Sequence, residues 1–127
     1  MANTILKLTA ILIMLAPTTV FASTANDMDG DGKADILWRN IATGRNWTYL
    51  MNGASISTSQ GINTESDQNW HIVGNGDYNG DDTADILWRN RATGRNWMYL
   101  MNGASISTSQ AVNTESDQNW QIVNVDQ

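Results

Sequence analysis

The sequence of 127 residues contains no cysteine, one histidine and few basic residues. The lack of cysteine excludes a disulfide framework, a thiolate zinc site and a cysteine nucleophile. The single histidine, His71, excludes a metal site built from several histidines. Seven Lys and Arg against thirteen Asp and Glu argue against a nucleic-acid partner, because a phosphate backbone is bound by a basic surface. The 41% hydrophobic content and six tryptophans are too apolar for a disordered chain, and the length allows one ordinary domain.

The apolar run of residues 8–16 near the N-terminus is typical of a secretory signal peptide. Lys7 precedes the run, and the small or apolar residues 20–22 indicate a cleavage point before Ser23. The run is far shorter than the about 20 apolar residues of a membrane span, which makes a membrane anchor the weaker alternative. We therefore predict a signal peptide over residues 1–22, a secreted, periplasmic or extracellular protein, and no membrane span in the mature chain.

Most of the remaining chain consists of two nearly identical sequence repeats. Residues 27–76 and 77–126 differ at twelve of 50 positions. A period near 50 residues is typical of propeller blades, solenoids and repeat arrays. We predict a first repeat over residues 23–76 and a second over 77–127, which ends in an additional inner strand.

The pattern within each repeat predicts short strands. Residues 34–39 and 47–51 alternate between two faces, and the second segment stops at the turn dipeptide Asn-Gly. Residues 55–58 form a weaker, polar segment suited to an outer edge, and residues 70–73 form a short apolar one suited to an inner position. Helical spacing is not sustained anywhere in the repeats. We predict an all-β fold of two tandem four-stranded blades of the β-propeller type.

Each repeat begins with the acidic loop pattern D-x-D-x-D-G-x-x-D or a close variant, at residues 27–35 and 77–85. Calcium binds about six to eight oxygen atoms, which such a loop can offer from four side chains and one carbonyl. The predicted ligands are Asp27, Asp29, Asp31, the Lys33 carbonyl and Asp35 in the first loop, and Asp77, Asn79, Asp81, the Thr83 carbonyl and Asp85 in the second. Without a cation these carboxylates would repel one another, although an acidic surface turn remains the alternative.

The spacing rejects an EF-hand. That loop needs a bidentate acidic residue at position 12, where this sequence has Trp38 or Trp88. No flanking helix is predicted on either side. The second loop also has Asp82 in place of the turn glycine, which requires an aspartate in a left-handed backbone conformation.

The acidic loop, the following Ala-Asp-Ile-Leu-Trp-Arg-Asn and a Trp-rich strand ending in Met-Asn-Gly resemble bacterial FG-GAP/VCBS-type repeats. The resemblance implies blades like those of the integrin-alpha β-propeller, with the metal loop joining the first and second strands of a blade. It then places a first strand at 70–76, the loop at 77–85 and the remaining strands up to about Thr108. The Phe-Gly and Gly-Ala-Pro signatures are absent, and the chain has two repeats where the family has about seven blades.

The phase of the repeats predicts self-association. The mature chain begins at a metal loop, so its first blade lacks an inner strand. It ends in residues 120–125, an expected inner strand with no metal loop after it. We hypothesise that the terminal strand of one copy completes the first blade of another, giving an even-bladed ring. The alternative is a truncated fragment of a larger array.

The tryptophans and arginines are candidates for ligand binding, because exposed Trp rings stack on sugars. The candidates are Trp38, Arg39, Trp47, Trp88, Arg89 and Trp97. The alternative is that the Trp rings fill the wedge between blades. The acidic pairs Glu65/Asp67 and Glu115/Asp117 would be needed for a hydrolase, but their polar connector predicts solvated loops. We predict a non-catalytic, lectin-like calcium module that binds a glycan or a protein, with a structural or assembly fragment lacking its own ligand as the alternative.

Overall fold

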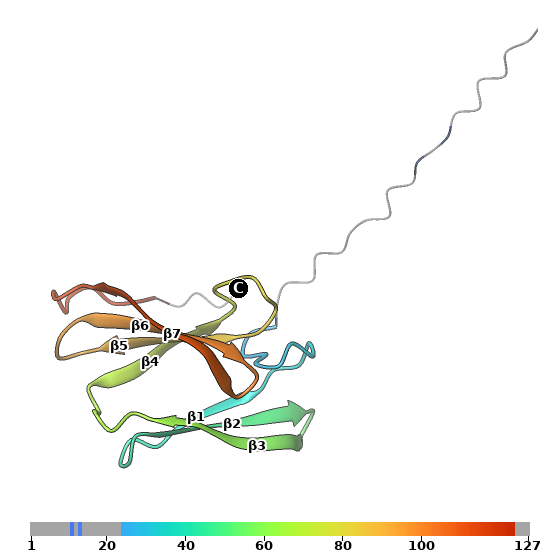
Figure 1. The fold of residues 1–127 in the computed structure, drawn as a ribbon, viewed down its shortest axis with the longest axis horizontal. Helices are drawn as coiled ribbons and strands as arrows, with labels where there is room; N and C mark the ends of the chain where they lie inside the picture. Colours follow the sequence, from blue (N-terminus) through green and yellow to red (C-terminus); the bar gives the residue numbers. More distant parts are fainter. Residues whose placement is uncertain (1–10, 12, 14–23, 124–127) are drawn as a thin grey trace, which may run out of the picture.

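The computed structural model describes residues 24–123 and the isolated positions 11 and 13. The signal peptide predicted for residues 1–22 therefore lies outside the described part, apart from those two positions. Within the described residues the chain forms seven strands and no helix (Figure 1). In that part of the chain, no helix has the length and apolar character needed to cross a membrane. The strands are β1 (Ile36–Arg39), β2 (Arg45–Asn52), β3 (Ser55–Thr64), β4 (Trp70–Gly76), β5 (Asp85–Asn90), β6 (Arg95–Asn102) and β7 (Ser105–Thr114).

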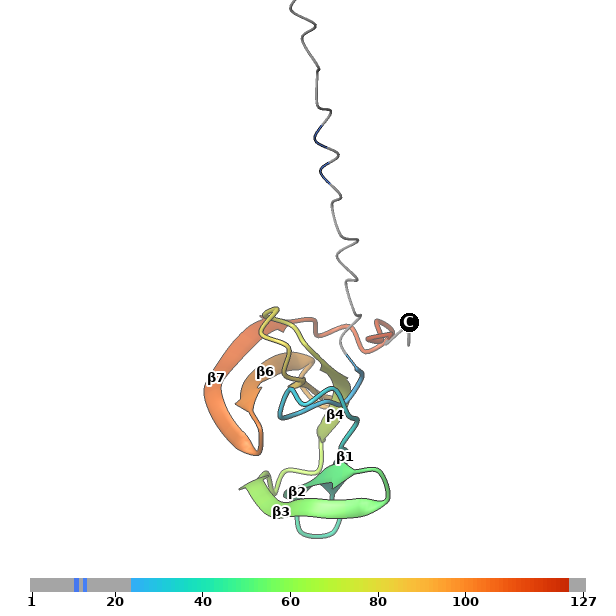
Figure 2. The same ribbon diagram turned by 90° about the vertical axis from the view of Figure 1, so that its right-hand side faces the viewer.

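The strands form two antiparallel sheets, which confirms the all-β prediction. The first has the order β1-β2-β3 and the second the order β4-β5-β6-β7. Figures 1 and 2 show them as two separate layers. The prediction of four strands in each sheet is wrong for the first, which has three strands in this chain, as the inner strand missing from the phase of the repeats implied. The reason is that β4, which ends the first repeat, pairs with β5 of the second.

The two repeats share one register. Trp38 lies opposite Trp47, and Trp88 lies opposite Trp97 in the same way. The outer strand β3 is longer than predicted, with 10 residues instead of the segment 55–58. Its Ser- and Thr-rich sequence is exposed on one edge of the sheet, as a polar edge strand should be. The hairpin before it turns at Gly53, whose φ of 61° is left-handed.

The hydrophobic core lies between the two sheets. Its buried members are Met28, Ala84, Ile86, Trp88 and Met101. Leu37, Leu50 and Ile62 of the first sheet pack against this cluster. Met28 comes from the first acidic loop and is fully buried, and the Thr48 hydroxyl lies 3.4 Å from its sulfur. The first loop is therefore part of the contact between the sheets.

The two faces of the first sheet differ in exposure. Ile36 and Trp38 are 39% and 51% exposed, while Leu37 and Arg39, which alternate with them on β1, are half-buried. The equivalent Trp88 in the second sheet is 2% exposed. The first sheet therefore covers the second with its Leu37 side and leaves its Trp38 side open to solvent.

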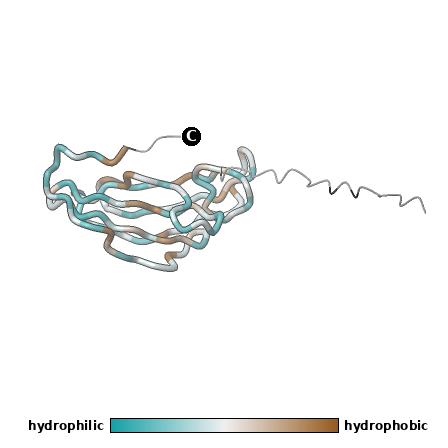
Figure 3. Tube along the Cα trace, turned by 90° about the horizontal axis from the view of Figure 1, so that it is seen from above, coloured by the Kyte–Doolittle hydropathy of each residue, from teal (hydrophilic) through white to brown (hydrophobic). Residues whose placement is uncertain are grey.

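The C-terminal inner strand expected at residues 120–125 is not formed over its described part, residues 120–123. Trp120 and Val123 are 67% and 77% exposed, and Figure 3 shows this apolar end of the described chain near the C label. The physical reason is the lack of a partner. The equivalent segment β4 is held by β5, which follows it in the chain, and no described strand follows residue 120. Residues 124–125 lie outside the described part.

Candidate functional site

The first acidic loop brings three of its predicted metal ligands together. One carboxylate oxygen from each of Asp27, Asp29 and Asp35 lies within 4.8 Å of the others. Asp27 and Asp35 are buried and Asp29 is exposed. Gly30 and Gly32 reverse the chain between them, with left-handed φ angles of 77° and 82°. The cluster offers hard oxygen donors, which fits calcium.

The second loop forms a similar cluster, but from a different set of loop positions. It lies between β4 and β5 and places oxygens of Asp77, Asp81 and Asp85 within 4.8 Å of one another. Asp82 adopts a φ of 66° where the first loop has glycine. The left-handed aspartate that the sequence analysis required is therefore present.

The remaining predicted ligands lie beside these clusters with other partners. Asp31 is outside the three-residue group, and its carboxylate lies 3.5 Å from Lys33 Nζ. Its counterpart Asp81 instead accepts a 2.7 Å hydrogen bond from the Thr83 hydroxyl. Asn79 Nδ2 lies 3.4 Å from the other Asp81 oxygen. The ligand roles of the Lys33 and Thr83 carbonyls stay predictions.

The first aspartate of each loop folds the loop through backbone hydrogen bonds. The Asp27 carboxylate accepts the N–H groups of Gly30 and Gly32, both at 2.8 Å. Asp77 accepts those of Gly80 and Asp82 at 2.7 and 2.9 Å. These bonds fold the loop around the carboxylate cluster.

The ninth aspartate has a bracing role that the sequence analysis missed. One Asp85 oxygen accepts the Tyr78 N–H at 2.9 Å and the other accepts the Met101 N–H at 2.8 Å. Asp35 makes the same two bonds to Met28 and Met51. Each ninth aspartate thus ties the start of its loop to the end of the β2 or β6 strand. The signal in the sequence was an aspartate directly before the apolar residues Ile-Leu-Trp of a strand.

Electrostatics in the clusters favour a bound cation. Burial raises the pKa of Asp85, and the nearby Asp81 and Asp77 carboxylates raise it further, against the lowering effect of the two N–H donors. Burial also raises the pKa of Asp29, with the neighbouring carboxylates adding to the rise. Burial is the larger cause of both shifts, and the repulsion between neighbouring carboxylates is the smaller part that a divalent cation would offset.

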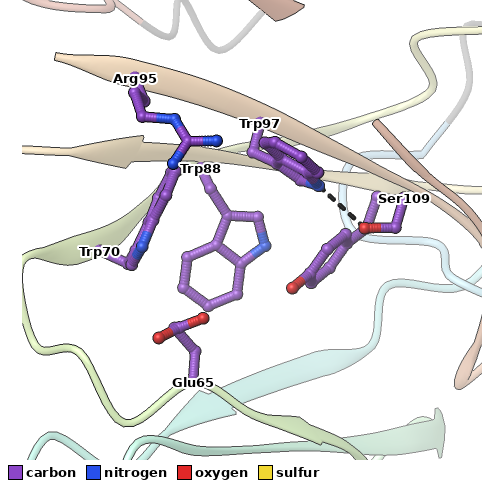
Figure 4. A pocket seen from close by; sticks show the side chains of 7 residues that line it. Glu65, Trp70, Trp88, Arg95, Trp97 and Ser109 are labelled. Atoms are coloured by element: carbon purple, nitrogen blue, oxygen red, sulfur yellow. Dashed lines mark hydrogen bonds between the residues drawn. The ribbon is translucent and has the colours of Figure 1, made fainter. Parts of the chain in front are cut away.

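A second candidate site is an aromatic pocket between the repeats, which encloses about 310 Å³ (Figure 4). It is lined by Glu65, Trp70, Trp88, Arg95, Trp97, Tyr99 and Ser109. The Arg95 guanidinium lies 5.5 Å from the centroid of the Trp97 ring. The Trp88 indole nitrogen is buried and has no hydrogen-bond partner among the described residues. A buried donor of this kind is costly unless an acceptor reaches it.

The six predicted ligand residues do not meet in one site. Trp88 and Trp97 line the aromatic pocket. Trp38 and Trp47 line a wider hollow of about 520 Å³ on the open face of the first sheet, and Arg39 borders it while its guanidinium lies over the Trp88 ring of the second sheet. Arg89 is buried and donates to backbone carbonyls of its own repeat, so it acts as a structural residue there.

The sequence analysis missed five residues of the aromatic pocket. Trp70, Arg95, Tyr99 and Ser109 were outside its ligand set, although Trp70 lies in a predicted strand segment and Tyr99 lies in the repeat equivalent of one. Glu65 was predicted in a solvated connector but is half-buried, with its carboxyl group directed toward the Trp88 ring (Figure 4). One Glu65 oxygen also accepts the Asp67 N–H at 3.0 Å.

Comparison with known proteins gives one family match. Residues 27–88 match the family model described as the FG-GAP-like repeat. The match begins at the first aspartate of the first loop and ends within β5. The search of curated proteins gave no match. The search of solved structures gave none either.

Proposed function

Because the chain is an FG-GAP-type repeat protein, we propose that it acts as an exported, calcium-stabilised binding module that recognises a glycan without catalysis. The observation that carries the proposal is the aromatic pocket between the repeats, with Trp70, Trp88 and Trp97 among its lining residues. The repeat match supports a propeller-type binding module, and the pocket supports the ligand class. The alternative is a structural unit with no ligand of its own.

The pocket chemistry suits a sugar ring. The faces of Trp70 and Trp97 offer the flat apolar surface on which the C–H groups of a pyranose stack. The Trp88 N–H has no acceptor but is shielded from solvent, so a first sugar hydroxyl has to displace the surrounding side chains before it accepts this hydrogen bond. Glu65 can accept a hydrogen bond from a second hydroxyl, and Arg95 can donate one. Few well-placed polar groups in an otherwise aromatic pocket are the usual basis of small-ligand specificity.

The proposed role of calcium is structural. The first loop packs into the core through Met28, and the second joins β4 to β5. An ion held by the acidic clusters would therefore brace the contact between the sheets. Calcium sites in extracellular modules bind at about 10⁻⁴–10⁻³ M, which is the affinity that we expect here. The predicted signal peptide supports an extracellular location.

The proposal includes no catalytic step. Glycoside hydrolysis ordinarily uses two carboxyl groups on opposite sides of the scissile bond. Among the described residues that line the pocket, Glu65 is the one carboxylate. Asp67 is exposed, and the Asn69 N–H lowers its pKa, which suits a turn residue. A single carboxylate supports binding and leaves the acid–base pair incomplete.

The experiment is a glycan array followed by titration of tryptophan fluorescence with the sugars that bind. We expect Trp97→Ala to reduce affinity at least tenfold, because the ring forms one wall of the pocket. Tyr78→Ala is the control, since it removes an aromatic ring that is 46% exposed outside the pocket. An array without any binding sugar, using protein whose fold is verified by circular dichroism, would favour the structural alternative.

A further inference from the structure

The contact between the two sheets uses two different faces. We call the side of each sheet that carries Trp38 or Trp88 the tryptophan face, and the side that carries Arg39 or Arg89 the arginine face. The arginine face of the first sheet covers the tryptophan face of the second. Arg39 lies 5.0 Å from the centroid of the Trp88 ring, and Asn63 Nδ2 donates to Tyr99 Oη at 3.0 Å.

Within residues 24–123, one face of each kind is left without a covering sheet. On the tryptophan face of the first sheet, Trp38 and Ile56 are 51% and 52% exposed. On the arginine face of the second sheet, Val112 is 54% exposed. Its first-repeat counterpart Ile62 packs against the core. The molecule therefore exposes one tryptophan face and one arginine face. The same two kinds of face already pack against each other inside the chain, where their sequences are nearly identical.

We propose that copies of this chain associate head to tail, with the arginine face of the second sheet of one copy covering the tryptophan face of the first sheet of the next. The repeat equivalence gives the contacts. Arg89 of one copy stacks on Trp38 of the next, as Arg39 stacks on Trp88 within the chain. Asn113 of that copy donates to the Tyr49 hydroxyl, as Asn63 donates to Tyr99.

The amide of Asn113 is already oriented for this bond. Asn46 Nδ2 donates to the Asn63 oxygen at 2.9 Å, which leaves the Asn63 nitrogen to bond Tyr99. Asn96 Nδ2 donates to the Asn113 oxygen at 2.8 Å in the same way. The Asn113 nitrogen has the same orientation but faces the open side of the sheet.

The second copy would also complete a site. Five residues of the aromatic pocket come from the second repeat, and the other two, Glu65 and Trp70, come from the first. The hollow on the open face of the first sheet contains the five equivalents, Trp38, Arg45, Trp47, Tyr49 and Ser59. The equivalents of the missing two are Glu115 and Trp120, which the docked arginine face would bring from the other copy. Each new contact therefore forms another aromatic pocket.

The C-terminal segment has to change partner in this association. In the single chain, the Trp120 carbonyl accepts a 3.3 Å bond from Arg89, and residues 120–122 lie over the arginine face. In the first repeat the equivalent segment pairs with the next sheet, with Ile72 opposite Trp88. The same pairing places Ile122 of one copy opposite Trp38 of the next. This exchange extends the first sheet to four strands.

The contact is heterologous, because it joins two different faces. Each copy offers one face of each kind, so association gives a ring if the rotation between copies closes and an open filament if it does not. The propeller-type arrangement of the sheets favours the ring. Every copy adds two sheets, which makes the number of sheets in a closed ring even. An isologous dimer, in which like faces meet, is excluded by the proposal.

The test measures the mass of the full chain by light scattering in calcium at about 10–100 µM. Two single variants each block one face at an exposed residue: Trp38→Glu on the tryptophan face and Val112→Glu on the arginine face. We expect the unchanged chain to form a discrete oligomer and each variant alone to be monomeric. An equal mixture of the two variants should form dimers, because it restores one unmodified pair of faces.

A charge control uses Ser55→Glu. Ser105 belongs to the second sheet, whose tryptophan face is covered by the first sheet, and it is still exposed. Its counterpart Ser55 is exposed as well, so this position lies outside the contact. The control should keep the oligomer mass. A monomeric unchanged chain, a variant mixture that stays monomeric, or a Val112→Glu oligomer of unchanged mass would each overturn the proposal. The readout is mass without ligand, so failed sugar binding does not affect it.

Discussion

The Asp27 carbonyl accepts a 2.7 Å hydrogen bond from the Ala84 N–H. Asp27 belongs to the first acidic cluster, and Ala84 precedes Asp85 of the second. One backbone bond therefore connects the two candidate metal centres. A loop that is ordered by an ion on one side holds its neighbour in the conformation that binds the next ion.

This connection predicts coupled calcium binding. Asp81→Ala removes one carboxylate from the second cluster and leaves the first unchanged in sequence. We expect the remaining site to bind calcium about fivefold more weakly, at the lower end of usual coupling energies. Isothermal titration of both proteins gives the two affinities. A remaining site of unchanged affinity would contradict the coupling.

Calcium should stabilise the fold, and Asp31 and Asp81, the fifth residues of the two loops, should contribute unequally to this effect. An ion at about 100 times its dissociation constant adds about 2.7 kcal/mol per site. Asp81→Ala should remove most of the stabilisation at its site, while Asp31→Ala should remove less because Asp31 lies outside its cluster. Melting temperatures in calcium and in chelator measure both effects. Equal losses for the two variants would show that Asp31 moves into the first site.

The bracing role of the ninth aspartate predicts a loss that does not need calcium. Asp85→Asn replaces one of the two carboxylate oxygens by an NH₂ group. That group cannot accept the hydrogen bond that the Tyr78 or Met101 N–H now donates. We expect the free energy of unfolding in chelator to fall by about 1–3 kcal/mol. Asp29→Asn is the matched control, because Asp29 is exposed and belongs to the other loop. Urea titrations of both variants provide the comparison, and similar small losses would refute the brace.

The turn at Gly44 predicts a steric loss. Gly44 has a φ of 79°, and a Cβ atom there would overlap the Glu65 carbonyl oxygen. Gly53 also has a positive φ, of 61°, but no atom lies near its Cβ position. Gly53→Ala should cost about 1–2 kcal/mol from backbone strain alone. Gly44→Ala should cost clearly more, and equal unfolding midpoints in urea would contradict the close approach.

His71 predicts a pH-dependent difference that the second repeat can report. Burial lowers the pKa of His71 below 6.5, and the nearby Arg91 and Arg39 lower it further. The unfolded chain therefore takes up a proton more readily, so stability from this residue is present above pH 6.5 and is lost as the pH falls below it. His71→Gln introduces the residue found at position 121. Denaturation from pH 8 to 5 should show that the variant loses less stability than the unchanged chain, and parallel curves would contradict this.

Much of the fold follows from local pattern, because alternation and Asn-Gly turns act within a few residues. The strands around Trp38, Trp47 and Trp70 lie where the alternation predicted them, and the acidic loops bring aspartates together. The length of β3 was not predicted, because a polar edge strand lacks the apolar alternation that marks a half-buried one.

What the pattern could not supply is the environment of identical residues. Trp38 and Trp88 lie in identical five-residue segments, yet one is half exposed and the other is buried. The difference comes from which sheet has a neighbour, and that information is not local. The same reasoning explains why the described part of the segment expected at 120–125 forms no strand, and why Glu65 lines a pocket instead of a solvated connector.

The exchange of β4 between repeats affects how such a chain can evolve. The sequence repeats at residue 77, but the sheets divide between β3 and β4. Each duplication therefore adds a unit whose last strand is stabilised only by the unit that follows. Inserting another copy at residue 77 would keep every existing pairing and create one more of the same kind. The gene can thus grow in steps of 50 residues without requiring a new kind of contact between repeats, whereas a cut at the same position would leave β4 without the strand it pairs with.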